Sequence, residues 1–136
     1  MKAQVKWIDN KRFVGISGSN NTIVMDADKQ ARTAGSPMEM VLMGLGGCSS
    51  VDVISILEKS RQVVHQCYVE MSATRAETIP AVFTHIHMNF VVEGENIKEA
   101  LVKRAVGLSA EKYCSVAQML GKGGVEITCG YTITSI

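Results

Sequence analysis

Residues 36–59 read SPMEMVLMGLGGCSSVDVISILEK, and only four of these 24 residues are charged. It opens with a helix start signal, because Ser36 can cap, Pro37 suits the first helical position, and Glu39 stands where a capping box needs an acid. From residue 40 to residue 48 no side chain is charged, and apolar or small residues cover every face of the turn. A helix without a polar face is typical of a buried element. The pattern therefore predicts a long central helix that is buried over its first half.

The second half of this helix has a polar stripe and the first half is rich in glycine. Each glycine inside a helix costs about 1 kcal/mol relative to alanine. Close approach by another backbone is the expected reason to keep such residues. The polar stripe is formed by Asp52, Ser55 and Glu58, and the glycines are Gly44, Gly46 and Gly47.

Length and composition bound the class of protein. The chain has 136 residues, 46% hydrophobic and 20% charged, as expected for one globular domain spanning residues 1–136. A formal charge of +1 gives no electrostatic reason to expect nucleic acid or an anionic membrane as a partner. The first ten residues lack the apolar core of a signal peptide, and the longest uncharged run is short for a bilayer. We expect a cytoplasmic protein that is not inserted in a membrane.

Short alternating segments surround the helix. Clean alternation of apolar and polar residues predicts half-buried strands, and glycine and proline mark their ends. The order of elements predicts an α+β domain in which antiparallel strands pack around the central helix. The predicted strands cover residues 3–8, 12–18, 22–25, 63–74, 83–93 and 125–135, and two further helices cover residues 96–108 and 110–120.

The four cysteines fall into two classes. They contain no CxxC pair, so the sequence favours neither a zinc ribbon nor a secreted disulfide framework. Cys67 and Cys129 lie on the apolar faces of predicted strands, where a thiol behaves as a small hydrophobe. Cys48 and Cys114 lie on helical segments, each followed by serine. These two are the candidates for chemistry, although a thiol is also common in a packed helix interior.

The histidines give a weaker signal. His85 and His87 share one strand face, but no carboxylate or cysteine nearby completes a metal-ligand set, so a polar strand surface is favoured over a metal site. His65 is predicted to face the core beside Cys67. We expect no metal and no cofactor.

The motifs around the two helical cysteines resemble those of the OsmC/Ohr family of thiol-dependent hydroperoxide reductases. In that family a proline opens a long buried helix, and a cysteine follows eleven residues later. Pro37 and Cys48 have this spacing, and Cys114 in AEKYCSV matches the second cysteine of the family. The strand and helix order also agrees. The resemblance implies an OsmC-like fold for the whole chain, assembled as an intertwined homodimer whose sites lie where the two chains meet. A helix apolar on all sides independently favours a second chain to cover it.

The resemblance also implies a mechanism. Cys48 would attack the O–O bond of an organic hydroperoxide as a thiolate and become a sulfenic acid. Cys114 would then condense with it to a disulfide, which a lipoyl or thioredoxin-type dithiol would reduce. These steps are the reversible part of thiol oxidation.

A buried thiol needs a cation or hydrogen-bond donors to lose its proton. The family uses an arginine from the N-terminal region, held by a glutamate near the start of the long helix. Arg32 is the favoured candidate, with Arg12 as the alternative, and Glu39 is the candidate glutamate, although a capping role also explains it.

Several residues depart from the family pattern. Met38 stands where the glutamate directly follows the proline, so Glu39 is displaced by one residue, and Ser115 replaces the usual proline after the later cysteine. Asp52 lies one turn after Cys48, where a like charge would disfavour the thiolate. The sequence therefore leaves open whether the chain is an enzyme. The alternative is a non-catalytic, redox-sensing or small-molecule-binding protein of the same fold.

Overall fold

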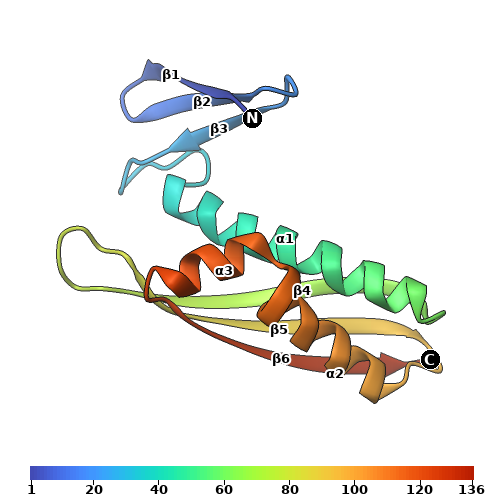
Figure 1. Ribbon diagram of the computed structural model, residues 1–136. Coiled ribbons are helices and arrows are strands. Elements are labelled where there is room, and N and C mark those ends of the chain that lie inside the picture. The colour runs from blue at the N-terminus through green and yellow to red at the C-terminus, as the bar shows by residue number, and fades with distance from the viewer. The chain divides into compact units, whose positions relative to one another are not determined.

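The computed structural model describes residues 1–136, which divide into two compact units, 1–43 and 44–136. It is a mixed α+β structure with two three-stranded sheets (Figure 1). The elements, in chain order, are β1 (Ala3–Asp9), β2 (Arg12–Ser17), β3 (Thr22–Asp26), α1 (Pro37–Lys59), β4 (Val63–Arg75), β5 (Phe83–Glu95), α2 (Glu99–Leu108), the π-helical turn η1 (Ser109–Tyr113), α3 (Ser115–Lys122) and β6 (Glu126–Ser135).

The first unit contains an antiparallel meander in the order β1-β2-β3, followed by a loop and the first turns of α1. Asn10 and Asn20 adopt positive φ angles of 41° and 64° in the two turns. Asparagine tolerates this left-handed conformation better than most residues, so it suits tight turns. Three short strands followed by a polar loop are what the sequence predicts.

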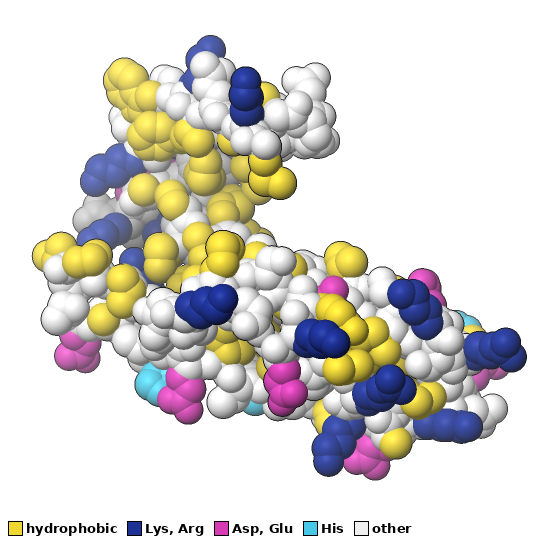
Figure 2. Space-filling view, viewed as in Figure 1, with side chains coloured by type: hydrophobic (Ala, Val, Ile, Leu, Met, Phe, Trp, Pro, Cys, Tyr) yellow, Lys and Arg dark blue, Asp and Glu magenta, His cyan; other side chains and the backbone are white.

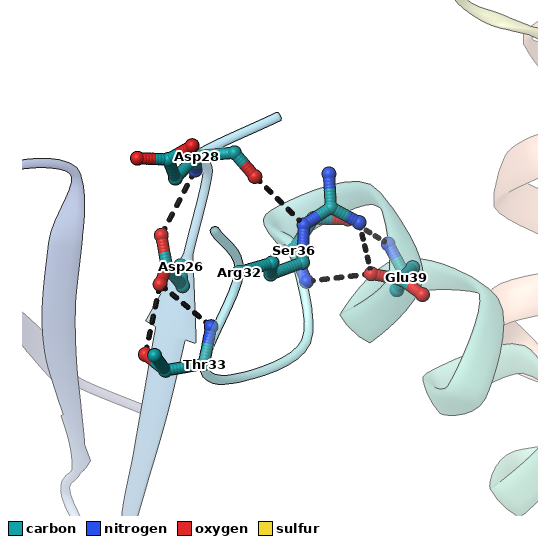
Figure 3. A network of polar contacts seen from close by, with 6 residues as sticks. All are labelled: Asp26, Asp28, Arg32, Thr33, Ser36 and Glu39. Atoms are coloured by element: carbon teal, nitrogen blue, oxygen red, sulfur yellow. Dashed lines mark hydrogen bonds and ion pairs between the residues drawn. The ribbon is translucent and has the colours of Figure 1, made fainter. Parts of the chain in front are cut away.

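Asp26 organises the loop between β3 and α1. Its side chain is 2% exposed. It accepts hydrogen bonds from the backbone N–H and the hydroxyl of Thr33, both at 2.9 Å, and from the backbone N–H of Asp28 at 2.9 Å (Figure 3). The N–H groups of Thr33 and then Asp28 lower the pKa of Asp26, because they stabilise its anion more than burial disfavours it. The loop that carries Arg32 is thereby tied to the end of β3.

The second unit contains a sheet in the order β4-β5-β6. β4 and β5 pair antiparallel, but β5 and β6 pair parallel, which corrects the prediction of antiparallel strands throughout. The reason is the long connection between β5 and β6. Parallel neighbours need a crossover of a dozen or more residues, and α2, η1 and α3 provide it. The helices of this crossover lie across one face of the sheet (Figure 1), and Cys114 lies within the crossover, between η1 and α3.

A register shift in β4 corrects the predicted position of His65. Pairing with β5 is irregular between Val64 and Gln66, so the alternation of faces slips before Cys67. His65 is exposed and its Nε2 lies 3.1 Å from a carboxylate oxygen of Glu95, instead of facing the core.

Within the second unit, α1 is buried on one side only. Leu45, Val53 and Leu57 have no exposed surface, whereas Val51 is 66% exposed. Around Gly44 and Gly47, a built β-carbon would meet no atom within 4 Å. The prediction of a helix buried on every side is therefore not met within one chain. α1 is long and apolar enough to cross a membrane by length and composition, but its apolar stripe packs as the core helix of a folded sheet-and-helix unit.

The surroundings of Gly46 show why a glycine stands at this position of α1. A β-carbon at this position would lie 2.7 Å from the Met71 sulfur and 3.3 Å from Val69 Cγ1, both on β4. A β-carbon here would force the Met71 side chain to move, so the expected close approach is present at Gly46. The approaching atoms belong to side chains of β4 and not to another backbone.

Gly46→Ala should destabilise the protein by about 1–3 kcal/mol through overpacking, despite the gain in helix propensity. Urea unfolding followed by circular dichroism measures the change. Gly107→Ala is the control, because α2 leaves open space there, and it should be neutral or stabilise by up to about 1 kcal/mol. Equal stability of the Gly46 variant and the wild type would contradict this packing.

Asp26→Asn should lower the melting temperature at neutral pH, because an amide cannot replace the carboxylate as an acceptor for three donors. The contribution of a carboxylate with a lowered pKa is present above its unfolded-state pKa of about 4 and is lost as the pH falls through the folded-state pKa. The difference between variant and wild type should therefore shrink as the pH falls below about 4. Glu58→Gln, at an exposed position in the last turn of α1, is the control. A difference that does not change with pH would contradict the role given to the Asp26 charge.

Candidate active site

The two helical cysteines come from different elements of the second unit. Cys48 lies in α1 and is half-buried, and Cys114 is completely buried. Cys114 does not lie inside a helix as the sequence predicts. The predicted helix over residues 110–120 is divided into η1 and α3, and Cys114 stands between them with an extended backbone, φ −75° and ψ 106°. A residue with this conformation can cap the helix that follows.

Cys114 is held as the N-cap of α3. Its sulfur accepts a hydrogen bond from the backbone N–H of Ala117 at 3.4 Å. The hydroxyl of Ser49, which follows Cys48 on α1, donates to the same sulfur at 3.2 Å. The proline that usually follows this cysteine in the family is replaced by Ser115, and the sequence here still starts a helix at that position.

Cys48 and Cys114 lie near one another, because Ser49, the residue after Cys48 on α1, donates to the Cys114 sulfur. The pKa of Cys114 is raised, first by burial and also by the neighbouring Cys48 thiol. Ser49 and Ala117 act in the opposite direction, because each donates a hydrogen bond to the sulfur. The structure thus brings together the two cysteines that the sequence singled out, over a separation of 66 residues.

A second layer of polar contacts fixes Ser49. Ser109, at the start of η1, is 1% exposed, and its hydroxyl lies 3.1 Å from the carbonyl oxygen of Ser49 and 3.0 Å from a carboxylate oxygen of Asp52. Asp52 is therefore engaged with Ser109. Sequence reasoning missed the roles of Ser49 and Ser109, since only the three-dimensional contact distinguishes them from other serines in helices.

The predicted arginine and glutamate meet in the first unit. Arg32 Nη1 donates to Glu39 Oε1 at 2.7 Å, and Arg32 Nε donates to the carbonyl oxygen of Asp28 at 3.1 Å (Figure 3). Glu39 also completes a capping box, because it accepts the Ser36 N–H at 2.9 Å while its own N–H donates to the Ser36 hydroxyl at 3.1 Å. The N–H of Ser36, more than any other group, lowers the pKa of Glu39.

Arg12, the alternative candidate, is engaged elsewhere. Its guanidinium forms a two-point ion pair with the carboxylate of Asp9, at the turn between β1 and β2. Arg32 and Glu39 thus form one charged pair in residues 1–43, and the two thiols form a separate pair in residues 44–136.

The other candidate groups have ordinary partners. His85 Nε2 lies 2.8 Å from a carboxylate oxygen of Glu126, and His87 Nδ1 lies 2.7 Å from the hydroxyl of Thr128. Burial raises the pKa values of the Cys67 and Cys129 thiols, and Cys129 is also affected by the charge of Cys114. The structure contains no group of three or more histidine, cysteine or acidic side chains arranged to hold a metal.

A groove of about 570 Å³ runs along the second unit between α1 and α2. One end is formed by Asp52 and by Tyr113, the residue immediately before Cys114. Lys59 and Arg104 line it further along, and neither forms an ion pair in the structure. This groove borders Asp52, and a second cavity of about 700 Å³ borders Ala117, whose N–H donates to the Cys114 sulfur.

Comparison with known proteins identifies the family and the fold of the chain. Residues 28–130 match the family described as OsmC-like protein. The chain is 51% identical to protein YhfA of Escherichia coli strain K12 over 99% of each chain. Among solved structures, a hypothetical protein from Aquifex aeolicus VF5 is 27% identical, with a TM-score of 0.88 and coverage of 99% of this chain and 96% of that one. The organic hydroperoxide resistance protein OhrB of Bacillus subtilis has a TM-score of 0.63 at 14% identity and coverage of 97% and 98%, which is a likeness of fold. The chain therefore belongs to the OsmC-like protein family.

Proposed function

We propose that this protein is a thiol-dependent hydroperoxide reductase that acts on organic hydroperoxides. Cys48 is the peroxide-attacking thiol and Cys114 is the resolving thiol. The observation that carries the proposal is the hydrogen bond from Ser49, the residue after Cys48, to the Cys114 sulfur at 3.2 Å, which brings a half-buried and a completely buried cysteine near one another. The fold shared with an organic hydroperoxide resistance protein is a supporting argument by analogy.

The proposed reaction balances in three steps. The Cys48 thiolate attacks one peroxide oxygen, the O–O bond breaks, and the alkoxide takes a proton to leave as an alcohol while Cys48 becomes a sulfenic acid. The Cys114 thiolate then attacks the Cys48 sulfur and expels hydroxide, which leaves as water after protonation. A lipoyl or thioredoxin-type dithiol reduces the resulting disulfide and is itself oxidised to a disulfide.

The exposure of the two cysteines fits this division of roles. Cys114 has no exposed surface, so a peroxide must first reach Cys48. A resolving thiol in contact with Cys48 would capture the sulfenic acid before further oxidation. Asp52 accepts a hydrogen bond from Ser109 and keeps its negative charge, which acts against a Cys48 thiolate.

We also propose that Arg32 assists the Cys48 thiolate and that Glu39 orients Arg32. The ion pair between them at 2.7 Å and the contact of Arg32 with the Asp28 carbonyl fix the guanidinium within residues 1–43, and its role toward the thiolate is what the family resemblance implies. We propose a cytoplasmic location, because the four cysteines show no CxxC pair and no spacing typical of a secreted disulfide framework.

Reduced protein mixed with cumene hydroperoxide should consume it rapidly and acquire a Cys48–Cys114 disulfide. Cys48→Ser should abolish consumption, because the attacking sulfur is lost. Cys114→Ser should allow one turnover and then accumulate sulfinic acid at Cys48. Peroxide loss measured with a ferrous-iron assay, together with alkylation and peptide mass mapping, gives both results.

Cys67→Ser is the matched control, because this half-buried thiol lies on β4 and should leave turnover unchanged. The enzymatic proposal fails if Cys48 and Cys114 both remain alkylatable in excess peroxide. A disulfide that forms without peroxide turnover would instead favour a redox-sensing protein.

We further propose a homodimer in which a second chain covers the open side of α1. Gly44, Gly47 and Val51 follow one another along this side of the helix. A β-carbon at either glycine would meet no atom within 4 Å, and Val51 is 66% exposed. Hydrophobic side chains also reach the surface in clusters (Figure 2). A flat, apolar helix face with small residues is suited to close packing against the same face of another copy.

Val51→Arg should convert the dimer to a monomer, because it places an unpaired charge in the centre of this interface. Light scattering coupled to size-exclusion chromatography measures the mass. Ile79→Arg is the control, since Ile79 is fully exposed in the loop between β4 and β5 and should leave the mass unchanged. A wild-type protein that is monomeric at micromolar concentration would overturn the proposed dimer.

A further inference from the structure

We propose that Ser49 is a catalytic residue of the reductive half of the cycle. Its hydroxyl stabilises the Cys114 sulfur as the departing thiolate, so that the reducing thiol attacks Cys48 and not Cys114. This inference rests on the Cys48–Cys114 disulfide of the proposed function, but it concerns a different step and a different residue.

The surroundings of Cys114 are those of a leaving group. A thiolate leaves a disulfide more readily when its pKa is lower. Burial acts against Cys114 in this respect, because it raises the pKa of the thiol. The hydroxyl of Ser49 at 3.2 Å and the N–H of Ala117 at 3.4 Å both point at the sulfur and offset this effect. Hydrogen bonds to a charged acceptor are stronger than those to a neutral one.

Ser49 is held in place for this task. It is 1% exposed, so water does not compete for its hydroxyl. A serine inside a helix commonly bonds to a carbonyl of the preceding turn, whereas Ser49 donates to a sulfur from another element. Ser109 bonds to the Ser49 carbonyl at 3.1 Å and to Asp52 at 3.0 Å, which anchors η1 to α1 just before Cys114.

Solvent exposure also favours attack at Cys48 over attack at Cys114. Cys114 has no exposed surface, while Cys48 is half-buried. An external thiol therefore reaches Cys48 first. Exposure directs the attack to one sulfur, and the donors at the other sulfur stabilise the charge that this attack releases.

The step balances as follows. A deprotonated thiol of the reductant attacks the Cys48 sulfur, and a new S–S bond forms between them. The Cys48–Cys114 bond breaks and its electron pair remains on Cys114, which later takes up one proton. The second thiol of the reductant then attacks the reductant's first sulfur, which is bonded to Cys48 in the mixed disulfide. It expels Cys48 as a thiolate and closes the reductant into a cyclic disulfide.

The test begins with protein oxidised by diamide, so that disulfide formation does not require peroxidase activity. Reduction by dithiothreitol in a single turnover should be about tenfold slower in Ser49→Ala than in the wild type, as expected for loss of one hydrogen bond to a charged sulfur. Ser50→Ala, at the next position of α1, should reduce at the wild-type rate. Ser49→Thr, which keeps the hydroxyl, should recover most of the rate.

Two further readouts separate this role from a purely structural one. With 2-mercaptoethanol, mass mapping of the trapped intermediate should place the mixed disulfide on Cys48. In a Cys48→Ala background, Ser49→Ala should raise the Cys114 pKa measured from thiolate absorbance, whereas Ser50→Ala should not.

A mixed disulfide on Cys114, or an unchanged reduction rate in Ser49→Ala, would overturn the inference. Failure of diamide to join Cys48 and Cys114 would overturn it as well. If the diamide disulfide behaves as expected but the protein does not consume peroxide, the proposed function fails while the assignment of Ser49 stands. If peroxide is consumed but Ser49→Ala is reduced normally, only the assignment of Ser49 fails.

Discussion

The hydrogen bond between Ser49 and Cys114 links the central helix to the crossover that carries the second thiol. It is a contact between residues 65 positions apart, and it places the Cys114 sulfur beside Cys48. Ser109 reinforces it from the preceding π-helical turn. Without these contacts, Cys114 would be an ordinary buried thiol. With them, Cys48 and Cys114 lie near one another, as the proposed disulfide requires.

The parallel pairing of β5 and β6 explains how Cys114 comes near Cys48. β5 and β6 run in the same direction, so the chain between them must return across the sheet. The helices of that return lie against the same sheet as α1, which itself approaches β4 closely because residue 46 is a glycine. Breaking the return into η1 and α3 leaves Cys114 in an extended conformation at a helix start. In the proposed mechanism, this break between η1 and α3 positions the resolving thiol.

The sequence predicted the broad architecture, because hydrophobic period and capping signals are local. The start of the long helix, the three N-terminal strands and the grouping of Cys48 with Cys114 required only spacing and the family motifs. The parallel pairing of β6 could not be read from alternation, which is the same in both directions. His65 was misplaced because the irregularity in β4 leaves no sign in the alternating pattern. The contacts of Ser49 and Asp52 depend on the crossover, so no local pattern could reveal them.

In the proposed reaction, the Cys48 and Cys114 sulfurs form a disulfide in each catalytic cycle. A crystal structure of the protein after exposure to one equivalent of an organic hydroperoxide would test this. We predict continuous density between the two sulfurs, with an S–S distance of about 2.05 Å. Two separate sulfurs, with oxygen atoms on neither or on Cys48 alone, would contradict the account.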